Sequence, residues 1–472
     1  MAFQNNSLAY KGQPLTKETI KDLLYNSPEE IVHLVNKHIN NSGNLVFILE
    51  NMGHFPSTID PTFLISLATH SNEDVRFWAV KNLGKLKSPS FLNFFYRVYK
   101  NDPSTMVKRE AVSSIGRIKQ EAIIPALISI LENADPKIVC QAIRGLLPYK
   151  ANVSVTTALK GLIDHENEMV RAVIAKEFAD NKGKTTDKLK HPESFSFMQN
   201  VVVEGDVRKT LALVPDNSIH LTFTSPPYYN ARDYSIYPSY EAYLDFLSEV
   251  FQEVYRTTKE GRFLIVNTSP VIVPRISRAH SSKRYPIPFD LHTRLVDMGW
   301  EFIDDIVWMK PEYSVKNRVG GFQQHRKPLG YKPNAVTEYL MVYRKKTDKL
   351  IDWNIHQYSQ DIVSQSRVED NFETTNVWVI NPKSDKVHSA VFPEELCERV
   401  LRYYSYVGDL VFDPFAGSGT FGRTALRLKR KFFLTEQDHT YFTYIEDTMR
   451  GENASGSFRF LTFDEFAGSI NI

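Results

Sequence analysis

Leu410–Thr420 reads LVFDPFAGSGT, and this stretch decides the fold of the second half of the chain. The apolar run Leu410–Phe412 predicts a short buried strand, and Gly417 and Gly419 then allow a sharp turn into a helix. Glu436 ends the next strand-like run, where a carboxylate can accept both hydroxyls of a ribose. The stretch therefore predicts a ligand-binding turn at the carboxyl end of a strand.

The chain around this stretch alternates strand-like and helix-like runs. Strands are predicted at Val201–Val203, Ile219–Phe223, Arg262–Asn267, Phe302–Trp308, Thr337–Tyr343 and Phe432–Leu434, and helices at Tyr240–Tyr255, Phe289–Met298 and Pro393–Tyr404. Such alternation predicts a largely parallel α/β sheet.

A second motif, TSPPY at 224–228, directly follows a predicted strand. The hydroxyl of Ser225 and the carbonyl of Pro226 can accept the two hydrogens of an exocyclic nucleobase amine. Pro227 stiffens the backbone that carries these acceptors, and Tyr228 offers a ring on which a flipped-out base can stack. A proline turn that closes a strand is the simpler alternative, but the tyrosine and the preceding strand favour a base-binding pocket.

In this order along the chain, the two motifs resemble those of the β-group DNA amino-methyltransferases, whose catalytic half precedes the cofactor half. The resemblance covers about Phe195–Arg450 and includes Asp305–Pro311 (DIVWMKP), Thr337–Leu340 (TEYL) and His388–Leu396 (HSAVFPEEL), with Thr337 and Ser389 where His and Pro are usual. It implies a multidomain α and α/β protein in which residues 195–472 form a Rossmann-like S-adenosylmethionine-dependent methyltransferase domain with circularly permuted motif order.

The resemblance also implies which residues hold the cofactor, S-adenosyl-L-methionine. Asp413 can face its ammonium group, whereas a pyrophosphate would not favour that carboxylate; a nicotinamide site is the alternative, because Gly417, Gly419 and Gly422 also satisfy the dinucleotide fingerprint. Asp206 would lie near the adenine, or else cap the following helix. The expected cofactor-binding residues are Asp206, Thr224, Phe392, Pro393, Asp413, Pro414, Phe415, Ala416, Gly417, Gly419, Thr420 and Glu436, and the expected catalytic residues are Ser225, Pro226, Pro227 and Tyr228.

The expected substrate is the N4 amine of cytosine in double-stranded DNA. In this family Ser at the first place of the pocket motif goes mainly with cytosine-N4 and Asp mainly with adenine-N6, so adenine-N6 is the alternative. Cytosine-C5 methylation would need a nucleophilic thiol, and neither Cys140 nor Cys397 lies in a Pro-Cys loop. We expect a site-specific enzyme, either solitary or paired with a cognate restriction endonuclease. A non-catalytic repeat scaffold with a ligand-sensing methyltransferase fold is the alternative of another class.

A basic segment could read the DNA. Lys310–Lys346 holds nine Lys/Arg and two acidic residues, and the target-recognition region is expected within 310–376, either in this segment or in Ile351–Asn376. A solvated surface is the alternative for any basic loop. The expected DNA contacts are Lys310, Lys316, Arg318, Gln323, Gln324, Arg326 and Lys327.

The first 180 residues carry a repeat. Val75, Val107, Ile138 and Val170 are separated by 32, 31 and 32 residues, which is typical of paired helices stacked into a solenoid and resembles HEAT-type repeats. An irregular helical bundle is the alternative. Arg76, Lys108 and Arg171 recur at matching places, either as ion pairs between repeats or as a binding surface. The Lys-rich residues 181–194 are predicted to be a linker.

The composition agrees with a soluble, cytoplasmic protein. The formal net charge of the 472 residues is only +2, so a nucleic-acid surface must come from local clustering. Two cysteines give neither a disulfide framework nor a metal-ligand spacing, and no metal is expected. The N-terminus lacks a signal-like pattern, and no apolar run is long enough to span a membrane.

Overall fold

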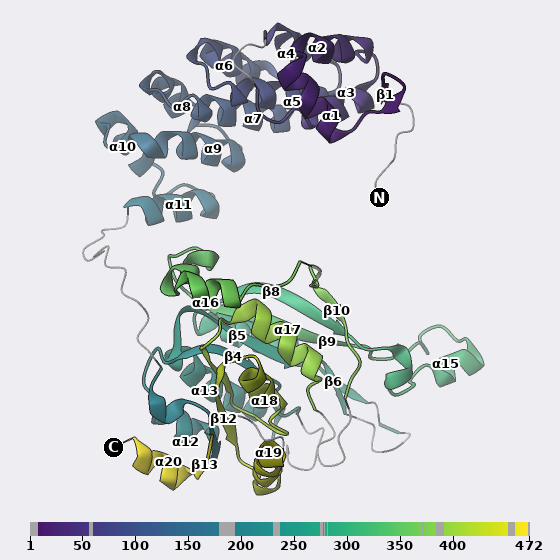
Figure 1. The fold of residues 1–472 in the computed structure, drawn as a ribbon, viewed down its shortest axis with the longest axis vertical. Coiled ribbons are helices and arrows are strands. Elements are labelled where there is room, and N and C mark those ends of the chain that lie inside the picture. The colour runs from purple at the N-terminus through teal and green to yellow at the C-terminus, as the bar shows by residue number, and fades with distance from the viewer. Residues whose placement is uncertain are drawn as a thin grey trace. The chain divides into compact units, whose positions relative to one another are not determined.

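The computed structural model describes residues 8–55, 60–178, 194–229, 237–273, 277, 279–280, 282–370, 372–383, 391–451 and 458–470. They belong to two compact units, Met1–Asp187 and Lys188–Ile472, which we describe separately (Figure 1). Residues 181–193 of the predicted linker and His388–Ala390 of the HSAVFP segment lie outside the described residues. Among the described helices, none is long and apolar enough to cross a membrane.

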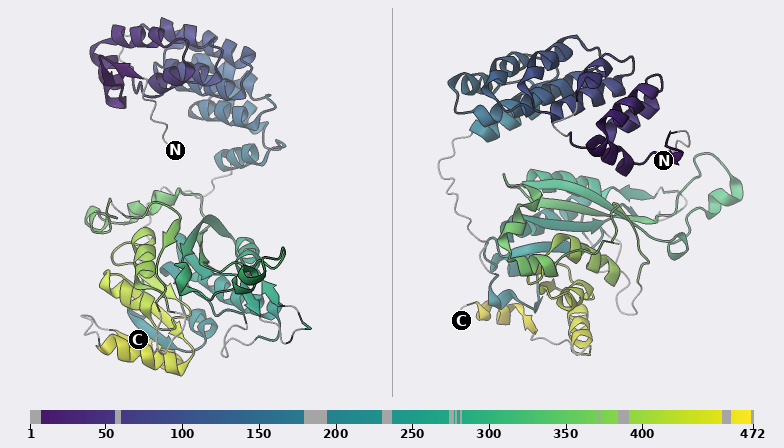
Figure 2. Two further views of the ribbon diagram at one scale, coloured as in Figure 1. Left: turned by 90° about the vertical axis from the view of Figure 1, so that its right-hand side faces the viewer. Right: turned by 45° about the horizontal axis from the view of Figure 1, so that its top comes forward.

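The N-terminal unit consists mainly of helices that stack in sequence (Figure 2). After a two-stranded β1–β2 ladder (Ala9–Tyr10, Gln13–Pro14) the helices are α1 (Lys17–Asn26), α2 (Pro28–Lys37), α3 (Ser42–Glu50), α4 (Thr62–Leu67), α5 (Glu73–Lys85), α6 (Leu92–Asn101), α7 (Thr105–Arg117), α8 (Ile124–Ile130), α9 (Pro136–Leu146), α10 (Val153–Lys160) and α11 (Glu168–Phe178). Helix α3 contacts α5, α5 contacts α7, α7 contacts α9 and α9 contacts α11. The repeat positions Val75, Val107, Ile138 and Val170 are all buried in this stack.

Ion pairs between successive repeats support the stack. Arg76 on α5 binds both carboxylate oxygens of Asp102, at 2.8 and 3.1 Å, in the segment before α7. At the next repeat the pairing residue is Arg109, whose Nη2 lies 2.7 Å from Asp135, and not the predicted Lys108. The prediction missed the position by one residue, because Arg and Lys stand side by side in the sequence. Arg171 instead donates to the carbonyls of His165 and Glu166.

The C-terminal unit is built on a sheet in which every described strand but β9 runs in the same direction. Its nine strands lie in the order β10 (Val377–Val379), β8 (Trp300–Met309), β9 (Thr337–Lys345), β5 (Thr258–Thr268), β4 (Ile219–Thr224), β11 (Leu410–Asp413), β12 (Lys431–Glu436), β3 (Val201–Glu204) and β13 (Arg459–Thr462). A small antiparallel ladder, β6 (Val271–Val273) with β7 (Lys283–Tyr285), follows β5.

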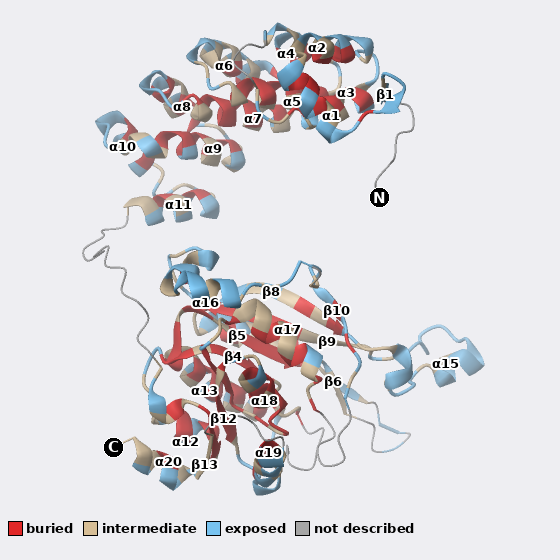
Figure 3. Ribbon diagram, viewed as in Figure 1, coloured by how far each residue is buried: buried red, intermediate tan, exposed pale blue. Residues whose placement is uncertain are grey.

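Helices cover both faces of this sheet because successive strand residues point to opposite sides. Val201 and Val203 belong to one core cluster together with residues of α12 (Val207–Ala212), α13 (Tyr240–Thr257), α14 (Ile287–Asp297) and α20 (Phe463–Ser469). Val202 belongs to the other, with residues of α17 (Glu394–Tyr404), α18 (Thr420–Arg427) and α19 (His439–Gly451). Figure 3 shows the buried strands between these layers.

The two edges of the sheet carry different segments. Strands β4, β5, β8, β11 and β12 all end at the same edge, which we call the carboxyl edge. The segment 310–336, which we call the arm and which contains α15 (Gly320–His325), leaves β8 and enters β9 at this edge. Because β9 runs the other way, the segment 346–376, with η6 (Ile351–Gln357) and α16 (Gln360–Gln365), lies at the opposite edge (Figure 1).

Candidate active site

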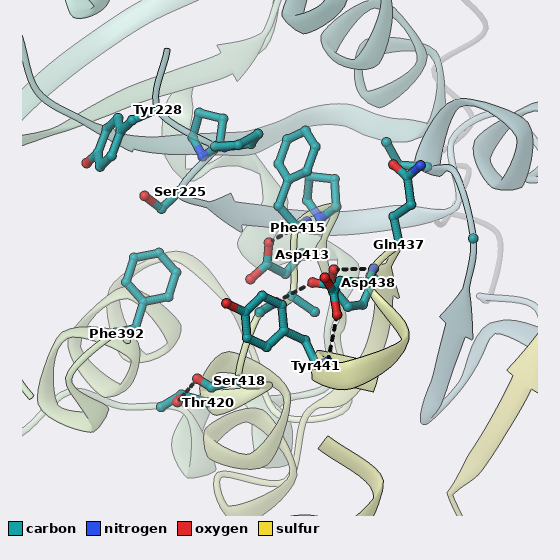
Figure 4. Close-up of a pocket in the computed structure, with 18 of the residues that line it drawn as sticks. Ser225, Tyr228, Phe392, Asp413, Phe415, Ser418, Thr420, Gln437, Asp438 and Tyr441 are labelled. Atoms are coloured by element: carbon teal, nitrogen blue, oxygen red, sulfur yellow. Dashed lines mark hydrogen bonds between the residues drawn. The ribbon is translucent and has the colours of Figure 1, made fainter. Parts of the chain in front are cut away.

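The two motif turns meet at the carboxyl edge. Strands β4 and β11 are direct neighbours, with Leu221 opposite Val411, so both turns leave the sheet side by side. The hydroxyl of Thr224 donates to Asp413 Oδ1 across this junction at 2.7 Å. Between the turns lies a cavity of about 450 Å³ (Figure 4).

Most of the predicted site residues line this cavity. They are Ser225, Pro226, Pro227 and Tyr228 from the first turn, Asp413, Pro414, Phe415, Ala416, Gly417 and Thr420 from the second, and Phe392 and Glu436. Thr224, Pro393 and Gly419 are not among the lining residues, but they adjoin lining residues in the chain. The structure thus brings together residues that lie almost two hundred positions apart.

The second turn depends on two glycines in left-handed conformations. Gly417 has φ +53° and Gly419 has φ +70°, which side chains rarely allow. A Cβ atom on Gly419 would also lie 2.7 Å from Ile445 of α19. The Gly417 amide donates to Glu436 Oε2 at 2.8 Å, so the turn is fastened to the end of β12. The glycines therefore set the shape of the cavity floor.

A buried carboxylate, Asp413, and a partly buried one, Glu436, border this turn. Burial raises the pKa of Asp413 to about 7, against hydrogen bonds from Thr224 and the Phe415 amide that favour the charged form. Burial likewise raises the pKa of Glu436 to about 7, although the amides of Asp438 and Gly417 donate to its two oxygens. In the described part of the chain no Lys or Arg pairs with either carboxylate. This wall is therefore suited to a ligand that carries positive charge or hydroxyl donors.

Asp206 does not line the cavity, so a contact between it and the cofactor stays a prediction. It is the N-cap of α12, where its Oδ1 accepts from the Arg208 amide at 2.9 Å, and it pairs with the Arg208 guanidinium. The hydrogen bond from Arg208 lowers the pKa of Asp206 despite partial burial. The neighbouring Gly205 and Val207 line the cavity instead.

Tyr228 stands at the end of the cavity near β9. Its hydroxyl donates to Glu338 Oε2 at 3.1 Å. Glu338 also pairs with Lys310, whose side chain is 18% exposed and lies 4.5 Å above the Trp308 ring. Lys310 is thus paired with a carboxylate of the protein, and its contact with DNA stays a prediction.

The other predicted DNA contacts remain accessible on the arm. Lys316, Arg318, Gln323, Gln324, Arg326 and Lys327 are all exposed. No acidic side chain of the described residues forms an ion pair with the four cations among them. Arg326 itself has φ +51° and ends α15, so the helix stops within the basic run.

Several cavity residues escaped the sequence analysis. Gln437 and Asp438 line the cavity from the turn between β12 and α19, and Tyr441 lines it from the first turn of α19. Phe246 lines it from α13, and Tyr237 lines it from the segment before that helix. The first three follow Glu436 directly, so the rule that ligands bind beyond strand ends could have found them. Phe246 carried no such signal, because its spacing along α13 matches that of core residues.

Family models and relatives agree with this site. Residues 219–447 match a DNA methylase family model of the N6/N4 type, and residues 92–179 match HEAT repeats. The type II β methyltransferase M.BslI of Bacillus sp. strain NEB-606 is 26% identical over 63% of this chain, which spans only 33% of that protein. M.XycI of Xanthomonas campestris pv. cyanopsidis, a type II methyltransferase, is 27% identical, with 57% of this chain and 94% of the relative covered.

Solved structures are similar over the same region. A putative DNA modification methylase from Thermus thermophilus, solved with S-adenosyl-L-methionine, is 28% identical and has a TM-score of 0.46, with 56% of this chain and 98% of that chain covered. The family match spans strands β4 to β12 and both turns that border the cavity. Residues 219–447 are thus similar to the DNA methylase family.

Proposed function

We propose that the chain transfers a methyl group from S-adenosyl-L-methionine to the N4 amine of cytosine in double-stranded DNA. The observation that carries this proposal is the single cavity shared by the TSPPY turn and the glycine turn. A base acceptor and a cofactor must meet within bonding distance, and only residues at one edge of the sheet can bring them together. The pocket turn precedes the glycine turn in the chain, which supports the permuted motif order.

The carboxylates suit this cofactor. S-adenosyl-L-methionine supplies the methyl group when bound, and it carries an ammonium and a sulfonium, both cationic. Asp413 would hold the ammonium, and Glu436 the ribose hydroxyls. A dinucleotide would instead place its pyrophosphate against these carboxylates, where like charges repel. Burial disfavours the charged forms of Asp413 and Glu436, so a cationic ligand beside them would offset this cost.

The first turn would hold the base. Ser225 Oγ and the Pro226 carbonyl would accept the two amine hydrogens and orient the nitrogen, and Tyr228 would stack on the flipped ring. The amine would then attack the methyl carbon directly as the carbon–sulfur bond breaks. S-adenosyl-L-homocysteine would leave and one amine proton would pass to solvent, with no covalent link to the protein. The cysteines support this route over a thiol mechanism: Cys397 is buried on α17 with its pKa raised by burial, and Cys140 belongs to the other unit.

The arm is the better candidate for target recognition. It leaves the sheet at the carboxyl edge, where the cavity lies, whereas 351–376 lies at the opposite edge. Its exposed cations can bind phosphates, and Gln323 and Gln324 can address base edges. The names of the relatives suggest a type II modification enzyme, for which a cognate restriction endonuclease would be the partner.

The test is mass spectrometry of nucleosides from DNA incubated with the protein and S-adenosyl-L-methionine. We expect N4-methylcytosine. Detection of N6-methyladenine instead would show that the protein is a DNA methyltransferase but would refute the assignment of cytosine as its target, which depends on Ser225. Cofactor binding without transfer to any DNA would contradict the proposal and favour a ligand-sensing scaffold.

A further inference from the structure

The wall behind Tyr228 contains a partly buried ion pair that the proposed mechanism does not use. Glu338, the second residue of β9, accepts hydrogen bonds from Tyr228 Oη at 3.1 Å and from Asn267 Nδ2 at 2.7 Å. Its other oxygen pairs with Lys310 Nζ. The side chains of Glu338 and Lys310 are only 14% and 18% exposed. One carboxylate thus joins the catalytic turn to three neighbouring strands.

The register of the sheet explains this meeting point. Glu338 lies opposite Trp308 of β8, two residues before Lys310, and Asn267 lies opposite Leu340 near the end of β5. Removing a carboxylate from water is costly unless a counter-charge and hydrogen bonds compensate it. Lys310 and Asn267 provide this compensation, and Trp308 lies under the ammonium at 4.5 Å. Glu338 is therefore held in place before Tyr228 contacts it.

The consequence for Tyr228 is orientational. A tyrosine ring turns about two side-chain bonds, and a hydrogen bond at its far end restricts both. Burial, and then the charge of Glu338, raise the pKa of Tyr228 well above its usual value, so the hydroxyl keeps its proton and remains a donor. A stacking surface that is fixed in advance loses less entropy when a base arrives.

We propose that Glu338, with Lys310 as its counter-ion, is a positioning residue that fixes the Tyr228 ring as the stacking wall for the flipped base. This inference rests on the proposed methyl transfer. It gives Lys310 a role inside the active site rather than on the DNA surface. The simpler alternative is an ion pair that only stabilises the sheet, without any effect through Tyr228.

A double-mutant cycle separates these two roles. Tyr228→Phe removes the hydroxyl and keeps the ring, and Glu338→Met keeps the approximate length of the side chain and removes the oxygen that accepts from Tyr228. We expect each change to lower kcat roughly tenfold, and the double variant to lose about tenfold rather than a hundredfold, because both changes break one shared link. The Kd for S-adenosyl-L-methionine, measured by calorimetry, should change less than about twofold.

Two further variants sharpen the cycle. Glu338→Asp keeps the charge for Lys310 but shortens the reach to Tyr228, so it should lose activity like Glu338→Met even if the latter folds poorly. The matched control is Glu260→Gln, which breaks a carboxylate–lysine pair with Lys349, 2.7 Å away in the same unit. It should leave kcat unchanged.

The outcomes are distinct. Additive losses in the double variant, or losses that only follow the unfolded fraction in thermal melts, would overturn the positioning role and leave the methyltransferase proposal standing. Absence of methyl transfer by the wild-type protein would overturn both.

Discussion

Two aspartates at the two ends of β11 are equally buried but have different neighbours. Asp409 just before the strand and Asp413 at its end are each 1% exposed. Burial alone would raise the pKa of both. The neighbourhood of Asp409 reverses this effect, and that of Asp413 does not.

At the opposite edge of the sheet, Asp409 is surrounded by donors. Arg262 pairs with one of its oxygens, Tyr358 donates to the other at 2.6 Å, and His220 Nε2 lies at 3.5 Å. The charge of Arg262 is the main cause that lowers the pKa of Asp409 despite full burial. This is a carboxylate whose compensation is complete within the protein itself.

At the carboxyl edge, Asp413 has hydrogen bonds but no cation among the described residues. Its pKa rises to about 7, as does that of Glu436. Asp409 and Asp413 thus differ in whether a cationic side chain of the protein pairs with the buried carboxylate. Where the fold leaves two carboxylates uncompensated beside a cavity, the missing positive charge belongs to a ligand.

The largest effect should follow substitution of the base-binding turn. Ser225→Ala or Tyr228→Ala should reduce methyl transfer at least about a thousandfold, because the amine loses its acceptor or the base loses its stacking surface. Binding of the cofactor should remain largely intact. The assay is transfer of labelled methyl groups to DNA, and unchanged turnover in either variant would refute the assignment of this turn.

Breaking the ion pair between Arg262 and Asp409 should mainly lower the stability of the fold. Arg262→Met leaves Asp409 buried without its principal counter-charge and should lower the free energy of unfolding by roughly 3–5 kcal/mol. Chemical denaturation measures this loss. The stabilisation by Asp409 is present above its usual pKa and is lost as pH falls through its lowered pKa, so the gap between wild type and variant should narrow in acid. A gap that stays constant with pH would contradict this account.

Removing the charge of Asp413, which has no counter-ion among the described residues, should instead stabilise the ligand-free protein. Asp413→Asn should raise the free energy of unfolding of the ligand-free protein by about 1–2 kcal/mol at pH 8, since the buried charge disappears. Because folding raises the pKa of Asp413, wild-type stability should fall as pH rises from 4 to 7, and the variant should show less of this fall. Destabilisation at pH 8 would indicate that Asp413 serves the fold rather than a ligand.

The smallest effect should come from the arm. The double substitution Lys316→Gln with Arg326→Gln should make the plot of log affinity for DNA against log salt concentration less steep by about 1–2. The reason is that fewer counterions leave the DNA on binding when two phosphate contacts are lost. Lys346→Gln with Arg367→Gln, at the opposite edge, is the matched control and should leave the slope unchanged. Equal changes in slope for the two double variants would contradict the proposal that DNA binds at the carboxyl edge rather than at the opposite edge.

Much of this architecture was predictable from sequence. The apolar runs gave β3, β4, β5, β8, β9, β11 and β12 and the helices between them, because strands buried on both faces leave clear apolar patterns. The turns of the site were recognisable because glycine and proline constrain the backbone directly. The short edge strands β10 and β13 were missed, since a few half-exposed residues carry little periodicity.

Side-chain partners were harder to predict. Nothing in the sequence told that Lys310 faces Glu338 rather than solvent, because their meeting depends on the register between β8 and β9. Asp206 could either cap a helix or face a ligand, and only the fold decides between these. Phe246 looked like any core residue until α13 was placed beside the cavity.

The most direct test is calorimetric titration with S-adenosyl-L-methionine at pH 7, in buffers that differ in ionisation enthalpy. If Asp413 and Glu436 are half protonated in the free protein and charged when the ligand is bound, binding should release up to about one proton per ligand. The release should vanish near pH 9 and fall by about half in Asp413→Asn. Failure to bind, or binding with no proton release in wild type, would contradict the claim that these carboxylates await a cationic ligand.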